Sequence, residues 1–369
     1  MKEARLSGVA RNRSGVARNW RLEAVYEEPS NDLARAEYAH WADEHGYPHG
    51  EFIQLQLAAV KRPLTSKEAA REAALLAAHG RHWLGPLAPI TTGVRFRRGF
   101  PADLVILAQD IDLKRIEGHP AFSTIESLEF EHVHGGRCRR TGSSQLGIAH
   151  PVFRALRVIS GIYGGPLLEA CAVHRQLERV AWFVPPEATG SMSAAPAPAV
   201  VARALRTLPA LRHVRVGNDA ITTSSAVDKE IARIVVGGHP RLARVSVVAD
   251  RRARGWLRRL RTSPAAELEL RADGCGTMNH PGMALSVRIA GHAIHPRARA
   301  AFTLPALEAE QYGVRAFVGA LPWLRKEGVE VVAVAVPDPS RNGPILLQAV
   351  SHIGLSVPTV QITPESHHE

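Results

Sequence analysis

The chain has 369 residues, 45% of them apolar, which is enough to bury the core of two domains or of one elongated array with an appended module. Its formal net charge of +11 is typical of proteins that bind nucleic acid, an anionic membrane surface or acidic proteins. Composition weakens that inference. Of the 46 basic residues 40 are Arg, and Ala, Gly and Pro are abundant, as codon bias in a GC-rich genome would produce.

The three cysteines, Cys138, Cys171 and Cys275, are odd in number and far apart. This pattern fits neither a disulfide framework nor a zinc clamp, and it favours a reducing compartment. No apolar run approaches the ~20 residues of a membrane-spanning helix, and the Arg-rich first residues lack the apolar centre of a signal peptide. The sequence therefore predicts a cytoplasmic protein without a membrane partner.

The first residues contain a tandem heptad, SGVARNR at residues 7–13 and SGVARNW at residues 14–20. Both copies are small and basic and offer little surface to bury. We expect residues 1–21 to form a flexible basic arm.

Helical periodicity begins near Asn31 and Asp32, either of which can be the N-cap, and stops at Gly46. A second helix is predicted over residues 50–61, and a third begins at the capping box of Thr65 and Glu68 and ends near Gly80. Together they predict a compact helical module over residues 22–100 that packs against a first strand at residues 104–107. The expected core of this module is Trp41, Phe52, Leu55 and Trp83.

Three stretches of this module resemble the bacterial repeat-companion domain family: LARAEYAHWADEHGYPHGEFIQLQ at 33–56, REAALLAAHGRHWLGPL at 71–87 and FRRGF at 96–100. The chain departs from the family pattern at His40 and Tyr47. The family commonly precedes segments that resemble leucine-rich repeats. The resemblance implies this architecture, and it implies no catalytic residue.

Beyond Phe100, apolar residues recur in the spacing LxxLxL, which turns the first, fourth and sixth residues of each short strand toward a shared core. The frames are Pro101/Leu104/Ile106, Ile125/Leu128/Phe130, Phe153/Leu156/Val158, Leu177/Val180/Trp182, Leu211/Val214/Val216, Leu242/Val245/Val247, Ala265/Leu268/Leu270, Ala284/Val287/Ile289, Val329/Val332/Val334 and Val357/Val360/Ile362. The sequence thus predicts an α/β fold over residues 101–365: a degenerate leucine-rich-repeat-like solenoid with a parallel β-sheet on its concave face.

We expect these strands to pair in parallel and in chain order, because consecutive strand-turn-helix units stack in one direction. Several frames follow a His-Pro turn. Helical segments are expected between the strands at residues 112–118, 166–174, 199–208 and 343–354, and a flexible loop at 185–198. The long interval from Ala284 to Val329 is expected to hold a weak repeat near residues 304–310 or an insertion.

Solvent-facing frame positions supply the candidate site, since solenoids bind ligands on their concave strands. Basic residues occupy these positions between acidic ends: Arg157, Arg179, His213, Arg215 and Arg244. This pattern predicts a non-enzymatic protein-interaction scaffold that binds an acidic partner. The alternative at these positions is an ordinary solvated face.

The densest charge lies at residues 251–261, RRARGWLRRLR. Its apolar residues share one helical face, so it can be a helix that packs this face and exposes its arginines. The other interpretation is an anion-binding surface, which would make the chain a nucleic-acid-binding protein. The residues concerned are Arg251, Arg252, Arg254, Arg258, Arg259 and Arg261.

Catalytic and metal-binding motifs are weak. His132, His134 and Cys138 have metal-like spacing without a second pair to complete a site, and Cys275 has no activating base beside it in sequence. His45 falls on the Trp41 side of its helix and is expected to pack there. We expect no cofactor or metal, while an enzyme with a site in a loop insertion remains the second alternative function.

Overall fold

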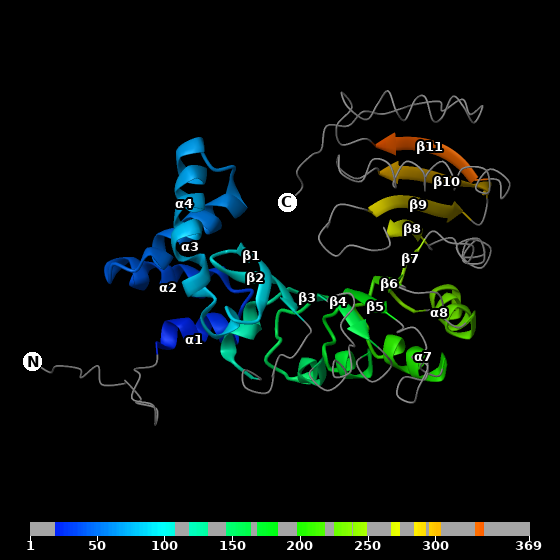
Figure 1. The fold of residues 1–369 in the computed structure, drawn as a ribbon, viewed down its shortest axis with the longest axis horizontal. Coiled ribbons are helices and arrows are strands. Elements are labelled where there is room, and N and C mark those ends of the chain that lie inside the picture. The colour runs from blue at the N-terminus through cyan, green and yellow to red at the C-terminus, as the bar shows by residue number, and fades with distance from the viewer. Residues whose placement is uncertain are drawn as a thin grey trace, which may run out of the picture. The chain divides into compact units, whose positions relative to one another are not determined.

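The computed structural model describes residues 19–107, 118–131, 145–163, 168–183, 198–217, 225–237, 239–248, 267–273, 284–292, 295–303 and 329–335. These residues form a mixed α/β fold whose elements are labelled in Figure 1. The chain divides into two compact units. The first comprises Met1–Leu107, Ile111–Glu129 and His150–Leu156, and the second comprises Ala108–Asp110, Phe130–Ala149 and Arg157–Glu369.

Four helices open the first unit: α1 (Trp20–Glu27), α2 (Asp32–Glu44), α3 (Pro48–Lys61) and α4 (Ser66–Trp83). The predicted positions of α2, α3 and α4 are confirmed, together with two of their caps. The Asn31 side chain accepts the amides of Leu33 and Ala34. Thr65 and Glu68 form the reciprocal capping box.

Helix α1 corrects the predicted basic arm at its last two residues. Trp20 and Arg21 begin a helix whose first turn is capped by Asn19, because the Asn19 side chain accepts the Arg21 amide. Val25 of this helix is fully buried against the other helices. The remainder of the predicted arm, residues 1–18, lies outside the described residues.

A β-hairpin follows the helices, within the stretch that was expected to be helical. After a short 3₁₀ turn, η1 (Gly85–Leu87), strand β1 (Thr91–Arg97) pairs antiparallel with β2 (Phe100–Leu107). The connection is Arg98 and Gly99, both with positive φ (52° and 86°), as a type I′ turn requires. Next come η3 (Pro120–Thr124) and β3 (Ser127–Glu131), which lies beside β2 in the strand order.

The core of the first unit is built mainly from small and aliphatic side chains. One buried cluster consists of Val25, Ala34, Ala39, Ile53 and Phe100. Of the four residues expected at the centre, Phe52 is fully buried, whereas Trp41, Leu55 and Trp83 are only half-buried. The alanines let the helices approach closely, so the large rings lie at the margin of the core.

The helices contact the hairpin through aromatic side chains of both of its strands. Their aromatic contacts to β2 are at Phe100, its first residue, whose ring centroid lies 5.9 Å from that of Tyr38. Leu104 and Ile106, in the stretch where packing was expected, are each 1% exposed.

The second unit holds a run of parallel strands in chain order, as predicted. Strands β4 (Val158–Tyr163), β5 (Arg179–Phe183), β6 (His213–Gly217), β7 (Arg244–Val248) and β8 (Glu267–Asp273) each pair in parallel with the next. Short helical elements lie between or before them (Figure 1): η4 (Gln145–Ala149), η5 (Cys171–Val173), the predicted α7 (Pro198–Arg206) and the additional α8 (Ser225–Gly237).

The expectation of parallel pairing is wrong after β8. Strand β9 (Ala284–His292) pairs antiparallel with both β8 and β10 (His295–Thr303), and β10 then pairs in parallel with β11 (Val329–Ala335). Only two residues separate β9 from β10, too few for the crossover that parallel neighbours need. The interval after Ala284 therefore contains a hairpin strand that was not predicted.

Inward frame positions are buried, as expected, wherever the described side chains allow the comparison, with one exception. Leu156, Leu177, Val180, Leu211 and Val245 are each fully buried. The exception is Val158, which is half-buried while the next residue, Ile159, is fully buried. Residues 112–117, 185–197, 304–310 and 343–354 and the frame that begins at Val357 lie outside the described residues.

Candidate interaction surface

Three of the five predicted site residues lie side by side on neighbouring strands of the second unit. Arg179 of β5 is the Cα partner of His213 of β6, and His213 is the Cα partner of Arg244 of β7. Adjacent strands lie about 4.8 Å apart, so the three Cα atoms form one lateral row. We call Arg179, His213 and Arg244 the basic row.

The pleat explains why these residues lie on the face opposite the core. Val180, Val214 and Val245 follow the members of the basic row directly, and each is at most 1% exposed. Successive side chains of a strand point to opposite faces, so the preceding residue in each strand projects away from the core. Arg179 is exposed, and His213 and Arg244 are half-buried.

The charge changes sign at the next strand, as the frames predicted. Arg244 is the Cα partner of Glu267 in β8, and one pleat further on Ser246 is the partner of Glu269. Arg215, the fourth predicted site residue, stands in that second lateral row, between Ala181 and Ser246. The basic positions are therefore followed, on the next strand, by two acidic positions, Glu267 and Glu269.

Arg157, the fifth predicted residue, is not part of a strand, because β4 begins at Val158. Its guanidinium forms an ion pair with Glu178, with 3.2 Å between Nη1 and Oε1. Its carbonyl accepts the amides of Glu178 and Arg179. Arg157 thus precedes the basic row by one position and shares its charge with a carboxylate.

Sequence reasoning missed Arg212, an exposed residue directly before the basic row. Its amide donates to the Glu178 carbonyl (2.8 Å), and its own carbonyl accepts the Arg244 amide (3.0 Å). The backbone ladder therefore places Arg212 next to Glu178. The only sequence signal for Arg212 was its position as the second residue of the Leu211 frame. Strand alternation does not assign this position to the core face or to the solvent face.

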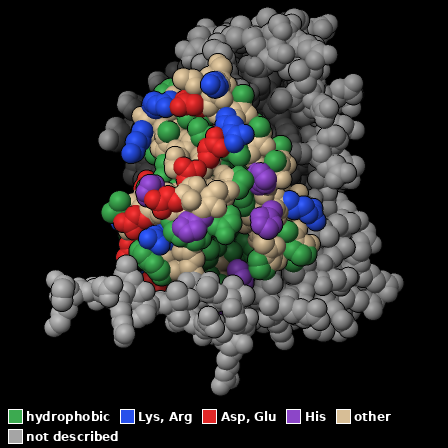
Figure 2. Space-filling view, turned by 90° about the vertical axis from the view of Figure 1, so that its left-hand side faces the viewer, with side chains coloured by type: hydrophobic (Ala, Val, Ile, Leu, Met, Phe, Trp, Pro, Cys, Tyr) green, Lys and Arg blue, Asp and Glu red, His purple; other side chains and the backbone are tan. Residues whose placement is uncertain are grey.

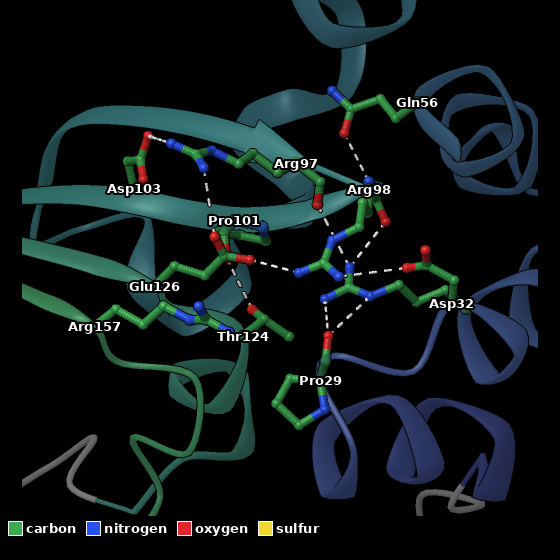
Figure 3. Close-up of polar contacts among 12 residues, drawn as sticks. Pro29, Asp32, Gln56, Arg97, Arg98, Pro101, Asp103, Thr124, Glu126 and Arg157 are labelled. Atoms are coloured by element: carbon green, nitrogen blue, oxygen red, sulfur yellow. Dashed lines mark hydrogen bonds and ion pairs between the residues drawn. The ribbon is translucent and has the colours of Figure 1, made fainter. Parts of the chain in front are cut away.

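A second polar network surrounds the hairpin turn of the first unit (Figure 3). Glu126 bridges Arg98 (2.5 Å) and Arg97 (3.5 Å), while Asp103 accepts from Arg97 (3.1 Å) and Asp32 lies 3.4 Å from Arg98. Each of these guanidinium groups has carboxylate partners within the chain. The network therefore ties the turn to its neighbours rather than offering free cations to a ligand.

Cys171 and the histidines of the first unit show no sign of catalytic activation. Burial raises the pKa of the Cys171 thiol to about 12, so it stays protonated and unreactive. Burial likewise lowers the pKa of His49 to about 4, against the effect of its 2.8 Å bond from Nε2 to the Gly99 carbonyl. His45 contacts Trp41 as expected, with 4.6 Å between ring centroids.

Within the described part of the chain, no group of three or more His, Cys, Asp or Glu side chains is placed to hold a metal ion. The metal-like set of His132, His134 and Cys138, the lone Cys275, and residues 251–261 all lie outside the described residues. None of the described helices is both long and apolar enough to cross a membrane.

Comparison of the chain with models of known families, with curated proteins and with solved structures finds no match. The resemblance of residues 22–100 to the repeat-companion domain family therefore stays a prediction, and the candidate site has to be interpreted from its own geometry.

Proposed function

We propose that the chain is a non-enzymatic protein-interaction scaffold in which the basic row and Arg215 bind an acidic segment of a partner protein. The observation that carries this proposal is the strand register, which aligns Arg179, His213 and Arg244 on three consecutive strands. A row of basic residues on neighbouring strands can meet several carboxylates of an acidic segment laid across the strands, and Arg can bind a carboxylate through two parallel hydrogen bonds.

The proposed architecture is a helical module followed by a leucine-rich-repeat-like solenoid, with the basic row on its concave face. It is supported by the four consecutive parallel strand pairs in chain order and by α7 and α8 between the strands. The helical module would cap the first repeats, which need a cover over their core. The antiparallel β9 limits the regular part of the solenoid to the strands before it.

The proposal is tested by charge reversal at two positions. Proteins captured from the source cell by the intact chain are compared with those captured by the double variant Arg179→Glu, Arg215→Glu. We expect capture of the acidic partner to fall roughly tenfold or more, because complementary charges govern encounter and orientation. Circular dichroism has to show that the variant is folded, so that a loss of capture reports on binding rather than on stability.

Arg241→Glu is the matched control, because Arg241 is an exposed basic residue of the same unit outside the strands. This variant should capture the partner as well as the intact chain does. Equal capture by the double variant would contradict the proposed site. Capture of nucleic acid with a steep dependence on salt would instead favour the alternative function of the arginines at 251–261.

A further inference from the structure

An exposed aromatic cluster marks the end of α2 in the first unit. The ring centroids of Trp41 and His45 are 4.6 Å apart, those of Trp41 and Tyr47 are 5.6 Å apart, and the His45 and Tyr47 rings are nearly parallel at 6.5 Å. Tyr47 is 53% exposed although it is a large aromatic residue. We call Trp41, His45 and Tyr47 the aromatic surface.

This surface is held in place by its neighbours. The Tyr38 ring stacks on Trp41 with centroids 5.9 Å apart, and Tyr38 itself contacts Phe100 of the buried cluster. The His45 Nδ1–H donates to the Trp41 carbonyl at 2.7 Å. In the neutral ring this bond places the proton on Nδ1, which leaves Nε2 to accept a hydrogen bond from a ligand.

The charge around the aromatic surface is opposite to that of the chain as a whole. Residues 36–60 contain four acidic residues and no Lys or Arg, in a chain whose net charge is +11. Glu37 and Glu44 stand four residues before and three residues after Trp41, so they share its side of α2. Asp43 is also exposed.

The partners of these carboxylates leave most of the negative charge in place. Glu51 forms an ion pair with Arg71, whereas Glu44 contacts His40 at 3.2 Å, a contact that is ionic only when His40 is protonated. Figure 2 shows the side of the helices that faces left in Figure 1. Histidine side chains gather in its lower half, acidic side chains are spread from its upper part to its lower left, and most Lys and Arg lie toward its upper end and edges.

Aromatic rings beside carboxylates form a surface that suits arginine. A guanidinium stacks on the face of Trp or Tyr and donates hydrogen bonds in its own plane to carboxylates. The aromatic surface supplies the rings, Glu37, Asp43 and Glu44 supply the carboxylates, and His45 Nε2 supplies a neutral acceptor. A cationic ligand of this kind is expected to be a peptide segment that carries several arginines.

We infer that the aromatic surface binds the basic segment at residues 1–18 of the same chain. This segment contains five basic residues and one acidic residue, and its heptad repeat presents arginine at positions 11, 13 and 18. It joins the first unit at Asn19, the cap of α1, and α1 packs on α2 in the buried cluster of Val25, Ala34 and Ala39.

Length and attachment favour binding within one chain. An extended segment of 18 residues spans up to about 60 Å, which exceeds the roughly 20 Å length of a 13-residue helix such as α2. The tether also keeps the segment at a millimolar effective concentration, so individually weak contacts between arginine and aromatic rings are sufficient.

Photo-crosslinking of the full chain tests this inference. Tyr47 is replaced by the photoreactive amino acid p-benzoylphenylalanine, and the crosslinked peptides are identified by mass spectrometry after digestion. We expect crosslinks to residues 1–18 within single chains, with a yield that falls at least severalfold when Arg11, Arg13 and Arg18 are changed to Gln or when the salt concentration is raised.

Val60 provides the matched control position, because it is 62% exposed on α3 of the same unit. The same photoreactive residue at Val60 should crosslink to residues 1–18 at most weakly. The charge reversals Asp43→Lys and Glu44→Lys, combined in the Tyr47 variant, should also abolish the crosslink while circular dichroism confirms folding.

Three outcomes would overturn the inference. The first is a crosslink yield at Tyr47 no higher than at Val60, and the second is a yield that neither the arginine substitutions nor the charge reversals change. The third is a crosslink formed only between two chains, seen as a covalent dimer, which would assign the surface to a second copy instead.

Discussion

Arg35 is a cation without a carboxylate bonded to it, buried inside the helical part of the first unit. It is 1% exposed, and its guanidinium donates to the carbonyls of Pro29 (2.6 Å), Arg98 (2.9 Å) and Arg97 (3.4 Å). Burial lowers its pKa to about 10, and the nearby Arg98 acts in the same direction. The group remains charged at neutral pH and joins the chain before α2 to the hairpin turn.

Replacing Arg35 by Met should therefore destabilise the first unit strongly. The apolar side chain fills similar volume but leaves three carbonyls without their donor, so we expect a loss of about 3 kcal/mol in the free energy of unfolding. Urea unfolding measured by circular dichroism provides the test. Arg81→Met is the control, since the exposed Arg81 of α4 should leave the midpoint unchanged when replaced, and equal midpoints for both variants would contradict the role of Arg35.

His49 makes the stability of this unit depend on pH. Its pKa in the folded chain is about 4, lowered by burial, against 6.5 for an ordinary histidine. Between these values the unfolded state binds more protons than the folded state, so stability is complete above pH 6.5 and falls as the pH drops toward 4. The loss over that range is at most about 3 kcal/mol.

The variant His49→Gln should remove this pH dependence. Glutamine can still donate to the Gly99 carbonyl but does not titrate, so its midpoint in urea should change less than that of the intact chain between pH 6.5 and 4.5. Carboxylates contribute equally to both proteins and cancel in the comparison. If the urea midpoints of the two proteins change with pH by the same amount, His49 is not the cause of the pH dependence.

At the scale of secondary-structure elements, His-Pro turns precede several strands of the fold. The Nδ1 atoms of His119, His150 and His239 each accept the amide two residues further on, at 3.2, 3.1 and 3.2 Å. A histidine here acts as an Asn or Asp cap would, and proline fixes the backbone of the next residue. The repeated His-Pro dipeptide is visible in the sequence, and the structure shows that its histidine accepts a backbone hydrogen bond.

Substitution at His119 distinguishes this cap from simple packing. His119→Ala removes the acceptor and should cost about 1 kcal/mol, whereas His119→Asn offers an oxygen to the same amide and should retain most of that energy. Thermal unfolding midpoints of the two variants measure the difference. If Asn is as destabilising as Ala, the hydrogen bond to Ala121 is not what His119 contributes.

The hairpin turn depends on a single glycine. At Gly99, φ is 86°, and a Cβ atom there would lie only 2.9 Å from the Cα of Ile53. Gly99→Ala should therefore lower the free energy of unfolding by about 3 kcal/mol or more, because the positive φ is unfavourable for Ala and the new Cβ would collide with the fully buried Ile53. Gly46 has φ 70° with nothing within 4 Å of its Cβ position, so Gly46→Ala should cost only about 1 to 2 kcal/mol. Equal losses in urea unfolding would contradict this account.

For the whole molecule, local signals predicted local structure well. The caps at Asn31 and Thr65 fixed the starts of α2 and α4, and the LxxLxL frames placed the basic row correctly because strand alternation and parallel register are both regular there. Helix α1 was not predicted because it has only eight residues and its first residue, Trp20, ends the tandem heptad that was assigned to the basic arm.

The failures of prediction have physical causes in particular residues. The β9–β10 hairpin lacks the usual turn signal, since Ala293 and Ile294 connect the strands where Asn or Gly is expected, and Pro296 stands inside β10. Arg157 was misplaced because β4 departs from the frame: its ladder is irregular between Ile159 and Ile162, around Gly161, where φ is 74°.

The unbroken register from β5 to β8 has a consequence for changes in the number of strand-helix repeats. His213 and Arg244 are equivalent positions, each paired directly with the strand before it. Deleting residues 213–243 would therefore join Arg212 to Arg244 and place β7 where β6 had been, next to β5. Gene duplication or deletion of such a segment could lengthen or shorten the basic row one residue at a time, and the reversed strand β9 sets the point beyond which such exchanges no longer preserve strand direction.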